Sequence, residues 1–274
     1  MAQVLVRRFP FSFALAWVPG GPVGLVDAWG APLRSAIVQA SGARHLYCRV
    51  YPMREQTSHD MERMKFAGWF QPQASLNSGM SLAYAPSQHE NARIAQASSS
   101  WRRNLRYSSK NGNVVTVWAE PDPEAILAVF EAMQSHKKLK RQFTRPQLIS
   151  MFSALSKRWS VLRCDDAHGR LVALRGALRF GNKAWEIFAA ATPEARKVYA
   201  SHAVFWELMR QCALLGVQFY DMGGVDPVRS KGVYDFKKGT GASNLTYLGE
   251  WEWATSSILR RAANYAIKHR VRSM

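Results

Sequence analysis

The residue types best suited to chemistry gather in one stretch near the end of the chain, residues 218–241. This stretch reads QFYDMGGVDPVRSKGVYDFKKGTG, so it combines a strand-like run, a glycine pair flanked by carboxylates, aromatic side chains and a lysine pair. A protein core seldom holds that mixture, because each buried charge needs a partner. We therefore interpret residues 218–241 as the active-site segment.

Within this segment, Gly223-Gly224 predicts a sharp turn after the strand-like run. Residues without a β-carbon let the backbone turn tightly and approach a ligand closely. Asp221 and Asp226 flank the pair, and two roles stay open for them. Either carboxylate could accept a proton from an ammonium group. Alternatively, each could fix the turn by binding its own backbone, which is the commoner behaviour of aspartate beside glycine.

A second unusual feature is the basic stretch WRRNLRYSSKN, residues 101–111. At 100° per residue, its cations fall within about a quarter of the helix circumference. These cations are Arg102, Arg103, Arg106 and Lys110. Trp101 and Leu105 lie together on another side, and no carboxylate partners the cations at i±4. We expect the helix to be anchored by its apolar side and to present its charges to phosphate oxygens, the alternative being a solvated basic face.

The charge balance also favours a polyanionic partner. The 274 residues include 37 Lys and Arg against 19 Asp and Glu, a net charge of +18. RNA, nucleotide phosphates and peripheral contact with an anionic membrane surface all fit this balance. The alternative is that the surplus serves solubility alone.

The cysteines and histidines support neither a disulfide framework nor a metal site. Cys48, Cys164 and Cys212 are widely separated among apolar neighbours, and no histidine pair has ligand spacing. No apolar run approaches the ~20 residues of a membrane span. We therefore expect a cytoplasmic protein without metal, since a reducing compartment suits unpaired cysteines.

Capping and turn signals predict the elements that position these residues. Two capping boxes, Ser87–Glu90 and Thr144–Gln147, predict helix starts. Turn signals at 167–169 and 181–183 predict three consecutive antiparallel strands. The last helix is expected over residues 252–270, where cations gather at its end.

The order of strands and helices occurs loosely in residues 3–85 and more sharply in residues 114–250. This weak structural repeat predicts two mixed α/β domains of similar plan. The boundary is expected where the basic helix stops and a new strand begins, which gives domains of residues 1–111 and 112–249.

Several of these stretches resemble the Fem-type aminoacyltransferases, which build peptidoglycan cross-bridges. YDMGGVD, then GVYDFKKGTGA and YLGEWEW, resemble the closing signature of that family. The GGPVG turn at 20–24, the RVYP run at 49–52 and the RRNLRYSSKNGNVV segment at 102–115 follow in family order. One departure is Thr240, where the motif usually closes with Phe.

The resemblance implies a mixed α/β fold of two tandem GNAT-like domains, with residues 250–274 packing back on the first domain. It also implies a reaction in which an amine attacks the ester of an aminoacyl-tRNA. The acceptor would be a peptidoglycan precursor or a related small-molecule amine. Such an aminolysis needs positioning and a stabilised oxyanion, and it needs no covalent enzyme intermediate or cofactor.

Lys237 matches the lysine of the F-K-K-G motif of that family, so we expect it to stabilise charge on the tRNA end or on the developing oxyanion. Lys238 is the reserve cation. Phe236 would offer a stacking face for the terminal adenine, the alternative being core packing. The other binding candidates of the segment are Gly223, Gly224, Tyr220 and Tyr234, and the other catalytic candidates are Asp221 and Asp226.

Two other functions stay open. A GNAT-like N-acyltransferase using acyl-CoA would carry a Q/R-x-x-G-x-G/A loop before a helix, and ATPEARKVYAS at 191–201 lacks those glycines. A non-catalytic RNA-binding module fits the charge but leaves the composition of residues 218–241 unexplained.

Overall fold

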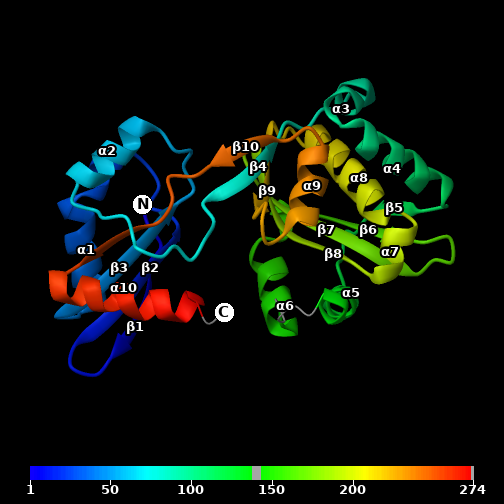
Figure 1. The fold of residues 1–274 in the computed structure, drawn as a ribbon. Helices are drawn as coiled ribbons and strands as arrows, with labels where there is room; N and C mark the ends of the chain where they lie inside the picture. Colours follow the sequence, from blue (N-terminus) through cyan, green and yellow to red (C-terminus); the bar gives the residue numbers. More distant parts are fainter. Residues whose placement is uncertain (138–142, 273–274) are drawn as a thin grey trace. The chain divides into compact units, whose positions relative to one another are not determined.

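The computed structural model, which describes residues 1–137 and 143–272, divides into two units. Unit 1 comprises Met1–Ser81 with Leu245–Met274, and unit 2 comprises Leu82–Asn244. The C-terminal segment therefore belongs to the same unit as the N-terminal one (Figure 1).

The contacts divide the chain before helices α3 (Glu90–Gln96) and α4 (Ser99–Lys110), whereas the sequence suggested a boundary after them. The reason is the packing of Trp101. Its side chain is buried, and its ring lies 5.9 Å from Phe205 and 6.0 Å from Trp206, both in unit 2. The basic helix is thus anchored through its indole, as its apolar side predicts.

Unit 1 contains a four-stranded sheet in the order β1-β2-β3-β11, with β1 (Leu5–Phe9), β2 (Phe13–Gly20), β3 (His45–Pro52) and β11 (Trp251–Ala254). β2 and β3 are parallel, and the outer strands are antiparallel to their neighbours. Its helical segments are η1 (Val26–Trp29), α1 (Ala31–Ser41), α2 (Ser58–Phe66) and α10 (Ser257–Arg272).

The prediction of a helix from residue 252 is wrong at its start, because Trp251–Ala254 form β11 and complete the sheet of unit 1. Trp251 lies opposite Val50 in the antiparallel register. Glu252, between the two tryptophans of this strand, is also fully buried. Its carboxylate accepts a hydrogen bond from the Tyr47 hydroxyl at 2.7 Å.

Unit 2 is built on a seven-stranded sheet in the order β10-β4-β9-β8-β7-β6-β5. The strands in that order are β10 (Ser243–Thr246), β4 (Met80–Tyr84), β9 (Phe219–Gly224), β8 (Lys183–Ala191), β7 (Leu171–Phe180), β6 (Trp159–Asp165) and β5 (Val114–Val117). The antiparallel run β6-β7-β8 confirms the three strands that the turn signals predict.

Helices cover both faces of this sheet (Figure 1). Besides α3 and α4 they are α5 (Pro123–Lys137), α6 (Arg145–Ala154), α7 (Pro193–Lys197), α8 (Ala200–Leu214) and α9 (Lys231–Gly239), with η2 (Ser156–Arg158) as a short 3₁₀ turn. Phe130 of α5 and Leu148 of α6 pack with Leu174 and Phe188 of the sheet. α8 lies against β6 and β7 on the opposite face, above the sheet in the view of Figure 1.

A β-bulge in β8 interrupts the alternation of its side chains. Gly176 pairs with Phe188 while Ala177 pairs with Glu186, so Ile187 is the extra residue. In a regular strand, residues 186 and 188 would face the same side. Here Phe188 packs in the α5 layer, whereas the Glu186 carboxylate pairs with Arg175. The bulge therefore separates an apolar position from a charged one.

Of the two predicted capping boxes, the one at Thr144 is confirmed and the one at Ser87 is wrong. Thr144 and Gln147 make the reciprocal bonds of a capping box at the start of α6. The Ser87 hydroxyl instead accepts a hydrogen bond from the His89 amide at 3.2 Å, in the turn before α3. The same residue pattern serves a tight turn there, because serine also bonds its own backbone two residues on.

Candidate active site

The candidate site lies where the parallel strands β8 and β9 stop pairing. Their ladder covers only Lys183–Trp185 and Phe219–Asp221. Beyond it, β9 runs into the glycine pair, where Gly223 has a φ of +76°. Glycine adopts this left-handed backbone without the penalty that a β-carbon imposes. Gly223 therefore interrupts the extended backbone within β9, at a point that we call the glycine turn, whereas the assigned turn of the segment follows at residues 227–230.

The FKKG motif forms part of helix α9, which the sequence analysis did not assign as a helix. From this helix the Lys237 side chain reaches back to the end of β9. Its ammonium group donates to the carbonyl oxygen of Met222, and it lies 3.3 Å from Gly223 O and 3.5 Å from Gly224 O. Lys237 is only 8% exposed, so a buried cation sits directly under the glycine turn.

Glu186 and Arg175 are functional candidates that sequence reasoning missed. The Glu186 carboxylate pairs with the Arg175 guanidinium on one oxygen and lies 3.8 Å from the Lys237 ammonium on the other. All three side chains are at least 90% buried. A carboxylate between two buried cations balances part of their charge. In the sequence, each of these two residues is a charged residue at an otherwise apolar position of one of two adjacent strands. The sequence does not show that their side chains pair.

The environment of Lys237 lowers the pKa of its ammonium group, chiefly because burial disfavours the charged form. The Glu186 carboxylate opposes this shift and the Arg175 guanidinium reinforces it. A cation of this kind can stabilise a developing negative charge, since it acts in a low-dielectric environment.

Phe236 lies in an aromatic cluster rather than alone on the surface. Its ring centroid is 6.1 Å from Trp101, 5.0 Å from His202 and 6.1 Å from Phe205, and the Arg175 guanidinium lies 5.0 Å from it. These contacts are those of core packing, although the side chain keeps partial exposure. Burial, with a contribution from Arg175, lowers the pKa of His202 to about 4. The cluster therefore contains a neutral imidazole at ordinary pH.

Both aspartates of the segment accept hydrogen bonds from backbone amides that follow them in the chain. Asp221 Oδ1 accepts from the Gly223 amide at 2.8 Å, and Asp226 Oδ1 accepts from the amides of Val228 and Arg229 at 2.9 and 2.8 Å. The two bonds to Asp226 lower the pKa of its carboxyl group, which makes it a weaker base. The geometry thus favours the turn-fixing role over proton transfer.

The remaining candidates of the segment occupy different environments. Tyr220 is fully buried, and its hydroxyl donates to Glu186 at 3.4 Å. It therefore contributes a hydrogen-bond donor to the buried charges of the site. Tyr234 is partly exposed, and exposed Lys238 donates to Ala242 O at 3.1 Å.

The cations of the basic face of α4 lie in two different environments. Arg103, Arg106 and Lys110 are exposed. Arg102 instead donates to the carbonyl oxygens of Ala97 and Ile94 at 2.9 and 3.4 Å, so it satisfies the C-terminal end of α3. The face is joined to the FKKG helix through Trp101, which contacts Phe236.

A family model for the FemAB family matches residues 124–268. The chain belongs to the FemAB family. Its fold is similar to the crystal structure of FemX, with a TM-score of 0.80 and 16% identity over 96% of this chain and 86% of that chain. A search of curated proteins found no match to the sequence.

This FemAB-family fold consists of two tandem GNAT-like domains, as the resemblance implied. It is also similar to L-PGS from Bacillus licheniformis, with a TM-score of 0.62 and 12% identity over 99% of this chain and 86% of that chain. A tandem GNAT protein from the clavulanic acid biosynthesis pathway gives a TM-score of 0.53 and 12% identity over 88% of this chain and 75% of that chain.

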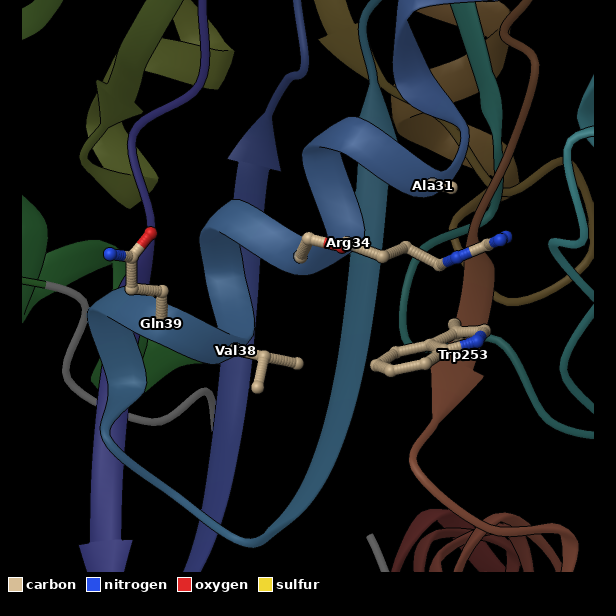
Figure 2. A pocket seen from close by; sticks show the side chains of 6 residues that line it. Ala31, Arg34, Val38, Gln39 and Trp253 are labelled. Carbon is tan, nitrogen blue, oxygen red and sulfur yellow. The ribbon is translucent and has the colours of Figure 1, made fainter.

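Unit 1 of the FemAB-family chain contains a shallow pocket of about 410 Å³ (Figure 2). It lies between α1 and β11, where the Arg34 guanidinium is 5.6 Å from the centre of the Trp253 ring. Arg34 also donates to the carbonyl oxygen of Ala67. None of the predicted site residues lines this pocket.

Metal-binding and membrane-spanning features are both missing from the part of the chain that the structure describes. Among residues 1–137 and 143–272, no group of three His, Cys, Asp or Glu side chains is arranged to hold a metal ion. Within the same ranges, none of the helices combines the length and apolar character needed to cross a membrane.

Proposed function

We propose that the protein transfers an amino acid from an aminoacyl-tRNA to an amine, by direct aminolysis of the ester. The observation that carries this proposal is the buried Lys237 cation beneath the glycine turn, at the point where β8 and β9 part. Membership of the FemAB family supports it, because the motif that holds Lys237 is the one that resembles the closing signature of the Fem-type enzymes.

In this reaction the acceptor nitrogen attacks the ester carbonyl carbon, so that a C–N bond forms and the C–O bond to the tRNA ribose breaks. The nitrogen loses a proton and the ribose oxygen gains one. Lys237 stabilises the oxyanion that forms between these steps. Its contacts of 3.3 and 3.5 Å with Gly223 O and Gly224 O are long enough to be exchanged for a bond to that oxygen.

The other residues of the site hold Lys237 in place. Glu186 and Arg175 fix the charge balance below it, and Asp221 fixes the turn above it. The acceptor is proposed to be an amine of a peptidoglycan precursor or of a related small molecule, in line with the family.

Replacing Lys237 with alanine tests the role of the cation. We expect the transfer rate to fall by about 10²- to 10³-fold, the usual effect of removing one group that stabilises an oxyanion. Lys231→Ala is the matched control, because Lys231 lies on the same helix but is exposed and pairs with Asp235. Transfer at the wild-type rate by a folded Lys237→Ala protein would exclude this mechanism.

A donor panel tests the reaction class. The protein is incubated with an acceptor amine and either a set of aminoacyl-tRNAs or a set of acyl-CoAs, and loss of each donor is recorded. We expect only aminoacyl-tRNA to be consumed. Consumption of acyl-CoA alone would indicate an N-acyltransferase, and binding of tRNA without loss of any donor would indicate an RNA-binding module.

A further inference from the structure

Unit 2 contains a pocket of about 430 Å³ that the proposed reaction does not use. It lies among α3, α4 and α8, and we call it the α3–α4 pocket. Its apolar lining comes from Ile94, Trp101, Leu105 and Trp206. Lys237, Glu186 and Asp221 do not line it, so it is separate from the buried charges of the candidate active site.

Trp206 offers this pocket an aromatic surface that is held in place. The Arg93 guanidinium lies 4.4 Å from the centre of its indole ring, and Arg93 is 2% exposed. Arg93 also donates to the Ser87 and Gln88 carbonyl oxygens, at 2.6 and 3.1 Å, which fixes its position. The indole is therefore held by a cation over one face and by the Trp101 ring 6.0 Å away, and its partly exposed surface lines the pocket, where it can contact a planar group.

Several surface cations of unit 2 are neutralised by a neighbouring carboxylate, whereas, within the described part of the chain, two exposed cations of α4 are not. Arg145, Arg170 and Arg210, for example, each pair with a carboxylate within 2.7 Å. No ion pair to Arg106 or Lys110 occurs among the described residues. Arg106 itself lines the pocket, so unpaired positive charge borders an aromatic surface.

We propose that the α3–α4 pocket holds one unstacked nucleotide of the tRNA donor, with the neighbouring phosphates lying along Arg103, Arg106 and Lys110. An aromatic surface beside a row of cations is the arrangement by which proteins bind unpaired nucleotides. Glu90 also lines the pocket, and its carboxylate favours a base with amino groups over a phosphate inside it. This inference rests on the proposed use of a tRNA donor.

Binding of uncharged tRNA tests the cations independently of transfer. The dissociation constant is measured against salt concentration for the wild type and for the double variant Arg106→Glu, Lys110→Glu. We expect at least 10-fold weaker binding at 0.1 M salt, and a log–log salt slope less steep by about 2, because two phosphates are no longer neutralised. Lys157→Glu is the control, because Lys157 is an exposed cation elsewhere in unit 2.

Substitutions that fill the α3–α4 pocket test whether it holds a nucleotide. Leu105→Trp adds bulk to the pocket without changing charge, and loss of a stacked base should weaken tRNA binding by about 5- to 150-fold at an unchanged salt slope. Ser109→Trp fills the same pocket from an exposed position if Leu105→Trp does not fold. Leu214→Trp, at an exposed site on α8, is the control for the added indole.

The outcomes separate this inference from the proposed function. If the wild type binds and consumes aminoacyl-tRNA but the pocket-filling variants bind as tightly as it does, the nucleotide pocket is excluded and the transfer reaction stands. An unchanged salt slope in the double variant would exclude the phosphate-binding role of the α4 cations. If the wild type neither binds tRNA nor consumes its aminoacyl ester, the proposed function itself fails.

Discussion

Replacing Glu186 with glutamine should destabilise unit 2 far more than the loss of an exposed carboxylate. Glutamine keeps the size of the side chain and removes its charge. Arg175 and Lys237 would then be two buried cations with no carboxylate between them, since Glu186 pairs with the first and lies 3.8 Å from the second.

The magnitude follows from the burial of these groups. Removing one partner of a buried ion pair costs about 3–5 kcal/mol of stability. For a protein of this size, each 1 kcal/mol lowers the thermal midpoint by roughly 2–4 °C, so the expected decrease is about 6–20 °C. Glu124→Gln is the matched control, because Glu124 pairs with Arg145 in an exposed ion pair whose loss costs about 1 kcal/mol or less.

The pH dependence of the deficit provides the second measurement. Burial lowers the folded-state pKa of Lys237 below its unfolded value, and the Glu186 carboxylate opposes that shift. The penalty for the buried ammonium is therefore present below the folded pKa and is relieved as the pH rises through it. Without Glu186 the folded pKa falls further, so the deficit of Glu186→Gln should shrink toward alkaline pH.

Thermal unfolding of the wild type, Glu186→Gln and Glu124→Gln between pH 7 and pH 10 measures both the loss of stability and its dependence on pH. Adding Lys237→Met to Glu186→Gln should restore part of the lost stability, because one of the two unbalanced cations is removed. A Glu186→Gln protein as stable as the Glu124→Gln control, or a deficit that does not change with pH, would refute this account of the buried charges.

Two further predictions concern stability alone. Gly241→Ala should cost well over 1 kcal/mol of stability, because Gly241 has a φ of +93° and an added methyl group would collide with the Gln96 carbonyl group. Gly169→Ala is the control, because Gly169 has a φ of +73° but open space around it, and its cost should be about 1 kcal/mol. Equal thermal midpoints of the two variants would contradict this prediction. Burial lowers the pKa of His202 to about 4. The protein should therefore lose stability as the pH falls from about 6.5 to 4, because the imidazole of the unfolded chain takes up a proton before that of the folded chain. His202→Gln should remove that part of the pH dependence of unfolding.

Some local signals in the sequence predicted local structure, although the capping box at Ser87 did not. The turns at 167–169 and 181–183 lie between β6, β7 and β8, and Thr144 caps α6, because each depends on a few neighbouring residues. The division of the chain differed because it depends on Trp101, whose packing partners are far away in the sequence. The same limit explains β11, which is a strand only because β3 is available to pair with it.

The candidate site shows the same division between local and distant information. The glycine turn and the bonding of Asp226 to its own backbone follow from adjacent residues. Glu186 and Arg175 lie on different strands, and their pairing depends on register, which the sequence does not display. The sequence therefore located Lys237 but not the charges that hold it.

The bulge at Ile187 lets β8 place an apolar side chain on one face of the sheet and a charged side chain on the other. Phe188 fills the apolar side, where Gly176 opposite it leaves room for its ring, and Glu186 supplies charge to the other side. Deleting this single residue would restore the regular alternation and turn a carboxylate toward the helices α5 and α6. Insertions and deletions in β8 should therefore be far less tolerated in descendants of this gene than substitutions at its surface, because a change in strand length would disturb the buried charges and the core together.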